Sequence, residues 1–256
     1  MKPFKLVRIA IIVTVLVIVA AGQLLREKRL ASWRNTVLIT VYPLIADGRD
    51  GTQAYASRLG PDSFADIGAF FARESQRYGQ ALDQPLRVQV ARPSTVLPPP
   101  VPKSDNPLAI AWWSLKMRWW TWRQERQDGL PAPDIQVFVL YRDGQGAPVL
   151  DRSVGLRKGM FALVNAYALA GMATRNRVVI AHELLHVLGA TDKYAGSDNM
   201  PAWPDGFANP NQVPRYPQRL AEIMGGRIPL AQGRARMPAS LRECVIGPLT
   251  ASEIGW

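Results

Sequence analysis

The sequence predicts an α+β domain that follows an apolar N-terminal segment. Segments rich in β-branched residues alternate with segments whose apolar residues recur at helical spacing. Turn-forming Gly and Pro residues separate these segments. Hydrophobic residues make up 48% of the 256 residues, which is enough for a buried core. The predicted boundaries are residues 1–30 for the N-terminal segment and residues 31–256 for the folded domain.

The N-terminal segment has the sequence of an export signal or a membrane anchor. Residues 9–21 form an uncharged apolar run that follows three basic residues. This length is typical of a cleaved signal, but the continuation through Leu25 approaches the length of a membrane-spanning helix. Because a basic stretch follows at once, we predict an uncleaved, single-pass transmembrane anchor, with cleavage as the alternative. The domain is then expected on the extracytoplasmic side.

The first half of the domain is predicted to alternate strands and helices. Residues 35–45 are β-branched and apolar, which predicts a strand. Residues 62–79 carry apolar side chains at helical spacing behind Asp62, which suits an N-cap. Residues 85–91 alternate as a second strand, and the Pro-rich residues 92–107 predict a loop.

Residues 111–123 contain five of the eight tryptophans of the chain. On a helix, one face would carry Trp112, Leu115, Trp119 and Trp122, with basic residues interspersed. One interpretation is a core helix that packs on the sheet. The other is a surface at the bilayer interface, where indole rings and basic side chains both reside.

The second half continues with two more predicted strands, at residues 135–141 and 160–167. Residues 176–189 then predict a helix that Asn176 caps and Gly189 ends.

Charge and cysteine content limit the partners of the chain. The formal net charge is +11, but Lys and Arg are spread along the sequence without a dense basic run. We therefore predict non-specific attraction to anionic lipids or polyanions and no specific nucleic-acid partner. The single cysteine, Cys244, excludes an intramolecular disulfide. The sequence predicts no particular oligomeric state.

Both histidines of the chain lie four residues apart in the helix predicted at residues 176–189. His182 and His186 would share one helix face and could bind one metal ion, while Glu183 lies near the same cavity as a base. The alternative is a pair of hydrogen-bonded core histidines. Random placement rarely gives this spacing together with the glutamate, so the pattern favours a metal site.

A catalytic zinc ion needs a third protein ligand, and the chain has no third histidine. Asp192 is the candidate, because Gly189 can adopt the left-handed conformation that ends the helix and lets the chain return a carboxylate to the metal. A later carboxylate, Glu222, is an alternative third ligand. The predicted cofactor is Zn²⁺.

The string His-Glu-x-x-His-x-x-Gly-x-x-Asp resembles the metzincin metallopeptidases, in which the less common snapalysin-like pattern has aspartate as third ligand. The resemblance implies a metzincin-like fold with a twisted mixed sheet, an active-site helix and a small C-terminal subdomain. Residues 31–189 and 190–256 would then be the upper and lower subdomains. Met224, in the sequence AEIMGG, would form the methionine turn beneath the metal.

The resemblance also implies two further features of the fold. Residues 161–167 would be the edge strand that pairs with extended substrate. Residues 247–256 look like the start of the closing helix, with Thr250 and Glu253 spaced as a capping box.

These observations predict a zinc-dependent peptidase that acts on a peptide or protein. Glu183 would be the general base for a zinc-bound water. Tyr194 could donate to the oxyanion, but a packing role is the simpler interpretation, and Tyr194 is not included in the catalytic set. Two alternatives remain: a membrane-anchored, non-catalytic binding module with a structural zinc, and a non-haem iron enzyme with two histidines and one carboxylate.

Overall fold

The computed structural model describes most of the chain beyond the N-terminal segment. The described residues are 27–102, 106–127, 129–145, 150–196 and 198–256, with Thr14, Ala21, Gly22 and Leu25. The predicted anchor at residues 1–30 therefore lies mostly outside the described residues. Within the described part, no helix combines the length and apolar character needed to cross a membrane.

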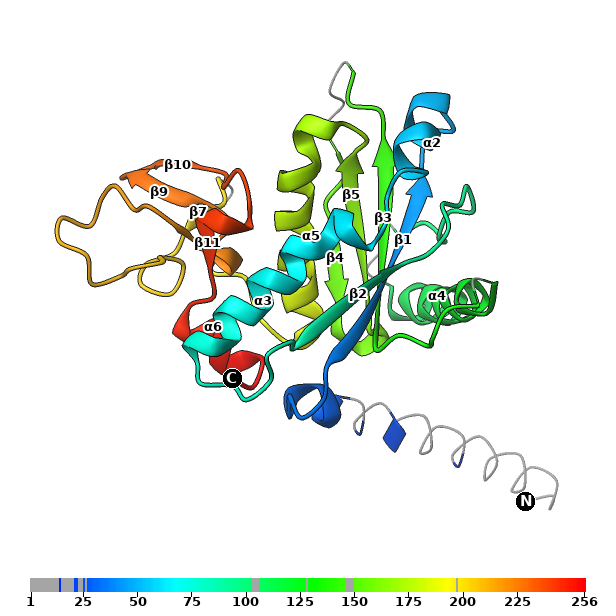
Figure 1. Cartoon of the computed structure of the whole chain (residues 1–256), viewed down its shortest axis with the longest axis horizontal. Helices are drawn as coiled ribbons and strands as arrows, with labels where there is room; N and C mark the ends of the chain where they lie inside the picture. Colours follow the sequence, from blue (N-terminus) through cyan, green and yellow to red (C-terminus); the bar gives the residue numbers. More distant parts are fainter. Residues whose placement is uncertain are drawn as a thin grey trace.

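A five-stranded mixed sheet forms the centre of this α/β fold (Figure 1). Its strands are β1 (Val37–Ile45), β2 (Leu86–Val90), β3 (Ile135–Arg142), β4 (Val154–Leu156) and β5 (Phe161–Tyr167). The strand order is β2-β1-β3-β5-β4; the first four are parallel, and β4 runs antiparallel to β5. Parallel strands need cover on both faces, which explains why β1 and β3 are apolar almost throughout.

The prediction that residues 161–167 form the edge strand is wrong. Strand β5 lies between β3 and β4, and β4 is the edge strand. Residues 154–156 run back along β5 and pair with its outer side, Val154 opposite Leu163 and Leu156 opposite Phe161. A three-residue strand is too short to show the alternation by which strands are predicted.

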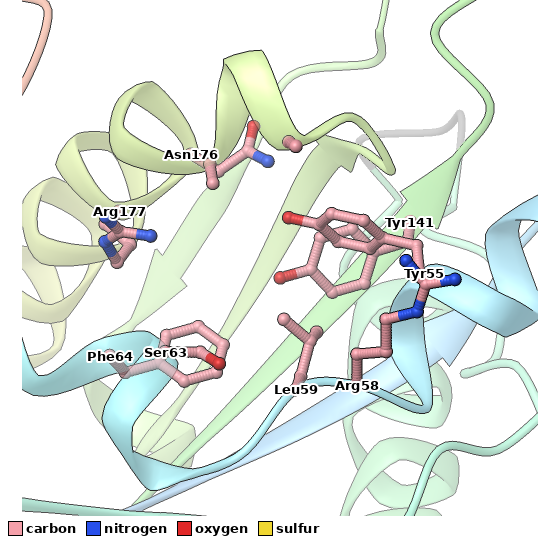
Figure 2. A pocket seen from close by; sticks show the side chains of 10 residues that line it. Tyr55, Arg58, Leu59, Ser63, Phe64, Tyr141, Asn176 and Arg177 are labelled. Atoms are coloured by element: carbon pink, nitrogen blue, oxygen red, sulfur yellow. The ribbon is translucent and has the colours of Figure 1, made fainter.

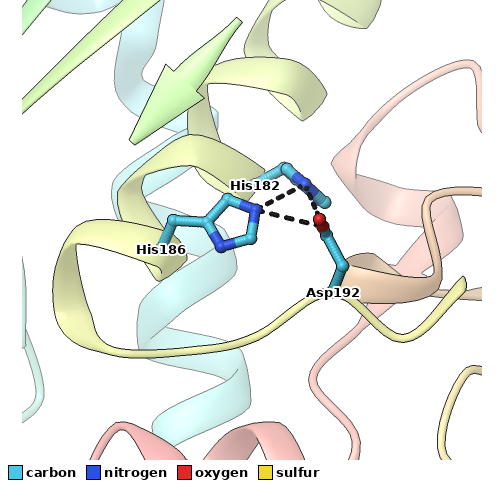
Figure 3. Close-up of side chains that lie close together, drawn as sticks. All are labelled: His182, His186 and Asp192. Atoms are coloured by element: carbon cyan, nitrogen blue, oxygen red, sulfur yellow. Dashed lines mark hydrogen bonds and ion pairs between the residues drawn. The ribbon is translucent and has the colours of Figure 1, made fainter. Parts of the chain in front are cut away.

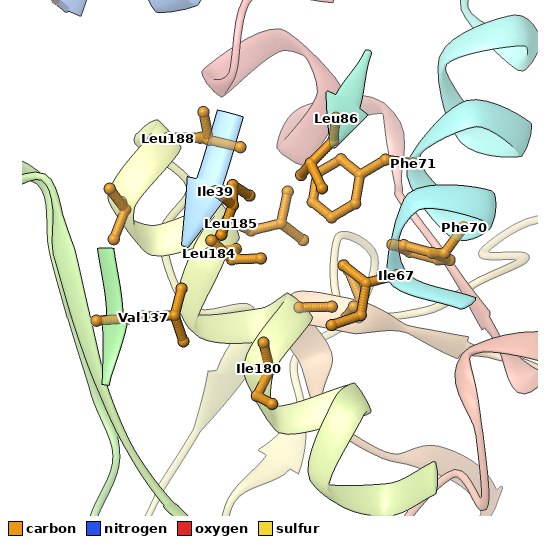
Figure 4. Close-up of a cluster of buried hydrophobic side chains, with 14 of the residues drawn as sticks. Ile39, Ile67, Phe70, Phe71, Leu86, Val137, Ile180, Leu184, Leu185 and Leu188 are labelled. Atoms are coloured by element: carbon orange, nitrogen blue, oxygen red, sulfur yellow. The ribbon is translucent and has the colours of Figure 1, made fainter. Parts of the chain in front are cut away.

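Helices cover both faces of the sheet (Figure 1). Helices α3 (Ala65–Arg77) and α5 (Ala173–Leu188) lie on one face, and α4 (Pro107–Gln127) lies on the other. The larger core fills the space beneath α3 and α5 (Figure 4); it includes Ile39, Ile67, Phe70, Phe71, Val137, Ile180, Leu184 and Leu185. The shorter helical elements are α2 (Asp50–Ala56), η1 (Pro61–Phe64), η2 (Arg157–Gly159) and η3 (Ala170–Met172).

Helix α4 packs on the sheet, but the side chains that make the contact are not those of the aromatic face predicted from the sequence. Trp113, Met117 and Trp120 are buried against a cluster that includes Phe138. The predicted face, which contains Trp112 and Trp119, is exposed instead.

Two predicted helix starts are wrong, and one predicted end is confirmed. Helix α5 begins at Ala173, so Asn176 lies inside the helix, where its side-chain amide donates to the Tyr167 carbonyl over 2.9 Å. Asp62 lies inside η1, because the 3-10 turn already begins at Pro61. Helix α5 ends where predicted: Gly189 is its C-cap, with φ of 117°.

The C-terminal residues from 190 onward form short pairs of strands and one closing helix. The strands are β6 (Tyr194–Ala195), β7 (Met200–Pro201), β8 (Ala221–Glu222), β9 (Ile228–Ala231), β10 (Arg234–Arg236) and β11 (Cys244–Val245). The helical elements are η4 (Ile223–Gly225), η5 (Leu241–Glu243) and α6 (Pro248–Glu253). The pairs are β6 with β7, β9 with β10, and β8 with β11. The division into subdomains at residue 189 stays a prediction.

The predicted capping box at the closing helix is wrong. Helix α6 begins at Pro248, so Thr250 already lies in its first turn. The Thr250 hydroxyl donates to Glu222, and Glu253 at the other end of the helix accepts hydrogen bonds from Thr191 and Lys193. Both side chains therefore tie α6 to other segments.

Candidate metal centre

The two histidines of α5 and the aspartate beyond it meet at one point (Figure 3). The Nε2 atoms of His182 and His186 are 3.1 Å apart. The Oδ1 atom of Asp192 lies 3.2 Å from the first and 3.1 Å from the second. Within the described residues, no other set of three or more His, Cys, Asp or Glu side chains converges so that one ion could be shared.

The other ring nitrogen of each histidine contacts a backbone carbonyl. His182 Nδ1 is 3.0 Å from the Ile223 oxygen, and His186 Nδ1 is 2.9 Å from the Ala190 oxygen. A carbonyl only accepts hydrogen bonds, so both Nδ1 atoms act as donors, and the Nε2 atom of each ring faces Asp192. Two imidazole nitrogens and one carboxylate oxygen therefore converge at one point. A cation at this point would satisfy all three.

The spacing of the three acceptor atoms fits a zinc ion. Tetrahedral zinc at ~2.0–2.1 Å from nitrogen and oxygen ligands holds those ligands about 3.3 Å apart. The observed separations, 3.1 Å and 3.2 Å, are close to that value. Burial alone would raise the pKa of Asp192, but hydrogen bonds with the two histidines hold that pKa well below its usual value. The carboxylate is therefore ionised and ready to bind a cation.

The turn after α5 places Asp192 opposite the histidines. Gly189 adopts a positive φ of 117°, which favours glycine, and reverses the chain. Beyond it, Glu253 accepts hydrogen bonds from the backbone and hydroxyl of Thr191 and from the buried Lys193. The Lys193 amide also donates to the Met224 carbonyl over 2.9 Å. Hydrogen bonds of the two neighbouring residues, Thr191 and Lys193, thus fix the backbone on either side of Asp192.

Met224 is fully buried within η4. It directly follows Ile223, whose carbonyl oxygen accepts the hydrogen bond from His182. The turn is fixed by Glu222, whose buried carboxylate accepts hydrogen bonds from the Gly225 and Gly247 amides and the Thr250 hydroxyl. Burial raises the pKa of Glu222. The structure therefore brings Asp192, and not Glu222, to the two histidines.

Glu183 borders the cavity of about 510 Å³ that contains the three converging side chains. Its Oε2 atom is buried and has no hydrogen-bond partner among the described residues. Burial raises the pKa of Glu183, although the two nearby histidines act in the opposite direction. A buried carboxylate oxygen without a partner, beside a cation site, is placed to bind a water molecule.

The edge strand β4 forms one side of this cavity and was not predicted from the sequence. Gly155 on β4 lies so close to α5 that a Cβ there would be 2.3 Å from the Glu183 carbonyl oxygen. Arg152, just before the strand, lies 3.5 Å from Asp192 and donates weakly to the Tyr194 hydroxyl over 3.4 Å. A single glycine and a single arginine in a short loop carry no spacing signal, which is why sequence reasoning missed them.

Tyr194 lies at the site, although it was not included in the predicted catalytic set. Its ring is nearly parallel to that of His182, with 6.5 Å between the ring centroids. Burial and a hydrogen bond with Asp192 raise the pKa of Tyr194, so its hydroxyl keeps its proton near neutral pH. The side chain lines the same cavity as Glu183.

A separate cavity of about 300 Å³ lies near the start of α5 (Figure 2). The rings of Tyr55 and Tyr141 lie side by side there, with 5.3 Å between their centroids, close to Asn176 and Arg177. Burial raises the pKa of Tyr141 far above its usual value. Arg177 is paired with Asp66 over 2.7 Å, whereas Arg58, which also lines this cavity, is exposed.

Comparison with known proteins finds distant similarity in structure but no match in sequence. No family model matches the chain, and no curated protein matches it. Among solved structures, the crystal structure of wild-type OgpA from Akkermansia muciniphila superposes with a TM-score of 0.45 and 10% sequence identity. The alignment covers 86% of this chain and 60% of that one, so the chain spans less than two thirds of the neighbour's length.

Proposed function

We propose that this chain is a zinc-dependent peptidase of the metzincin type. The observation that carries the proposal is the convergence of His182, His186 and Asp192 acceptor atoms within 3.2 Å of one another, next to the buried carboxylate of Glu183. The three would hold the ion, and Met224 would lie in the turn beneath it. Three protein ligands leave a coordination position for water or substrate, as in catalytic zinc sites.

When bound, zinc would supply a Lewis acid that polarises a carbonyl and makes the attacking water more acidic. Glu183 would take the proton from that water and pass it to the leaving amine. Its burial supports this role, because a raised pKa brings the carboxyl closer to the pH at which it can both accept and return a proton. The protonated Tyr194 hydroxyl lines the same cavity, and a turn of its O–H away from Asp192 would let it donate a hydrogen bond to the developing oxyanion.

A polypeptide substrate is supported by the position of β4. This strand is the edge of the sheet and lines the cavity that holds Glu183. An edge strand offers backbone donors and acceptors to an extended peptide, which could add as a further strand. The scissile bond would then pass over the metal site.

The alternatives receive less support. A structural zinc site is normally closed by four protein ligands, whereas the described residues bring three together. A non-haem iron enzyme would have no role for Glu183. The membrane anchor at residues 1–30 and an extracytoplasmic domain remain part of the proposal.

The test is peptide hydrolysis by the full-length protein and by Glu183→Gln, with zinc content measured for both. We expect the variant to keep its zinc and lose at least ~100-fold in kcat/KM, the usual scale for a removed acid/base group. Asp205→Asn, which changes an exposed carboxylate outside the cavity, is the matched control and should keep full activity. A wild-type protein that binds zinc but cleaves no member of a peptide library would instead support the binding module.

A further inference from the structure

Helix α4 has a second apolar face that points away from the sheet. Trp113, Met117 and Trp120 pack on the sheet, and the ring of Trp120 lies 4.6 Å from that of Phe138. The opposite side of the helix consists of large apolar side chains that are between 49% and 80% exposed: Leu108, Trp112, Leu115, Trp119 and Trp122. These five residues are called here the exposed α4 face.

The exposed α4 face is too apolar to be an ordinary water-exposed surface. Soluble proteins rarely expose a contiguous patch of large apolar side chains unless it binds something. The helix as a whole is held through its buried face, so the exposed rings are not needed to keep it on the sheet. The exposed α4 face is therefore expected to contact something other than the core of this domain.

The charge on the same side of α4 indicates the kind of partner. Lys116, Arg123 and Arg126 are exposed, and two of them lie over rings of the face: Arg123 is 5.5 Å from the Trp119 centroid, and Arg126 is 4.3 Å from that of Trp122. The sequence of α4 contains one acidic residue, Glu125. Exposed indole rings with interspersed cations are typical of surfaces that bind anionic lipid headgroups.

The chain that follows the apolar N-terminal run enters the fold at one end of this face. Residues 27–31 form a helical turn, dark blue in Figure 1, shortly after the apolar run at residues 9–21 and its continuation through Leu25. Within that turn, Arg29 pairs with Asp134. Asp134 and Trp122 line the same hollow of about 230 Å³. A segment with the sequence of a membrane anchor therefore leaves the domain beside the exposed α4 face.

We propose that the exposed α4 face docks on the surface of an anionic lipid bilayer. The indole rings would lie at the level of the headgroups, and Lys116, Arg123 and Arg126 would contact lipid phosphates. The domain is then held by two elements, the N-terminal segment and α4, and has a fixed orientation on the membrane. This inference does not depend on the metal centre.

The test uses the full chain reconstituted into vesicles of phosphatidylcholine and phosphatidylglycerol in equal amounts. Brominated phosphatidylcholine quenches tryptophan emission only when the ring lies in the bilayer. We expect clear quenching of the wild type, reduced at least about two-fold in the triple variant Trp112→Phe/Trp119→Phe/Trp122→Phe. Trp203→Phe is the matched control, because Trp203 is also 54% exposed and has Arg215 over its ring but lies far along the chain in the C-terminal region. It should leave the quenching unchanged.

A second variant keeps the rings and tests the charge. Arg123→Glu/Arg126→Glu should reduce the quenching in the same vesicles, and replacing phosphatidylglycerol by phosphatidylcholine should reduce it for the wild type. These side chains are exposed, so folding should be preserved and can be checked by circular dichroism.

Three outcomes would overturn the proposal. One is wild-type emission that brominated lipid does not quench. Another is equal quenching of the wild type and the triple tryptophan variant. The last is a change of oligomeric state in that variant without a change in quenching, which would make the face a contact between copies of the chain.

Discussion

Gly155 of the edge strand lies directly against Glu183 of the metal-binding helix. A Cβ at Gly155 would be 2.3 Å from the Glu183 carbonyl oxygen and 2.7 Å from the His186 Cβ. Only a residue without a side chain lets β4 approach α5 this closely. The contact sets the width of the cavity between the strand and the proposed catalytic base.

Replacing Gly155 by alanine should therefore impair catalysis more than folding. The added Cβ must push β4 away from α5, and displacements near 1 Å can cost about 100-fold in rate. We expect kcat/KM to fall at least ~10-fold with zinc still bound. Gly171→Ala is the control, because a Cβ at Gly171 meets nothing within 4 Å. Equal activity of both variants would show that the contact is irrelevant to catalysis.

Removing a proposed ligand should remove the metal. His186→Ala and Asp192→Ala each take away one of the three converging atoms. Zinc affinity should therefore fall by more than about 100-fold, which is more than the loss expected when a residue that only supports a metal ligand is removed. Zinc content after dialysis against a chelator measures this. If Asp192→Ala kept its zinc while Glu222→Gln lost it, the third ligand would be Glu222.

Zinc binding should weaken as the pH falls. Burial alone would lower the pKa of His186, but its hydrogen bonds with Asp192 and Ala190 raise that pKa above the usual value. Protons therefore compete with the metal from a higher pH than at an ordinary histidine, and affinity is lost as the pH falls through the raised pKa. Chelator competition between about pH 8 and pH 5 measures the change. Affinity independent of pH over this range would argue against histidine ligation.

Glu222 should act on stability. Its buried carboxylate accepts three hydrogen bonds that hold η4 and α6 together. Glu222→Gln replaces one accepting oxygen by an NH2 group, which leaves at least one buried donor unsatisfied and should lower the free energy of unfolding by about 1–3 kcal/mol, measured by denaturant titration. Glu243→Gln, at a more exposed carboxylate that binds Arg236, should cost less. An equal cost for both would mean that the Glu222 contacts do not stabilise the turn.

Much of the central sheet and the metal-binding helix could be predicted from the sequence. Strands β1, β2, β3 and β5 are long enough to show β-branched or alternating patterns, and Gly189 marks the end of α5 as expected. The four-residue spacing alone places His182 and His186 on one face of a helix. These features depend on residues close together in the sequence.

The features that sequence patterns missed depend on contacts between distant segments. Strand β4 has three residues, and its place at the edge follows from pairing with β5. Asn176 looked like a cap but binds the Tyr167 carbonyl, and Thr250 looked like a cap but binds Glu222. On α4, helical spacing grouped Trp112 with Trp119 correctly, but only packing decided that Trp113 and Trp120 face the sheet.

The most direct test of the proposed metal centre is a crystal structure of the zinc-loaded protein with anomalous scattering measured at the zinc edge. We predict one peak within about 2.0–2.2 Å of His182 Nε2, His186 Nε2 and an Asp192 carboxylate oxygen, with Glu183 facing the remaining coordination position. A zinc-loaded crystal without a peak at this point, or a peak held by Glu222, would contradict the account.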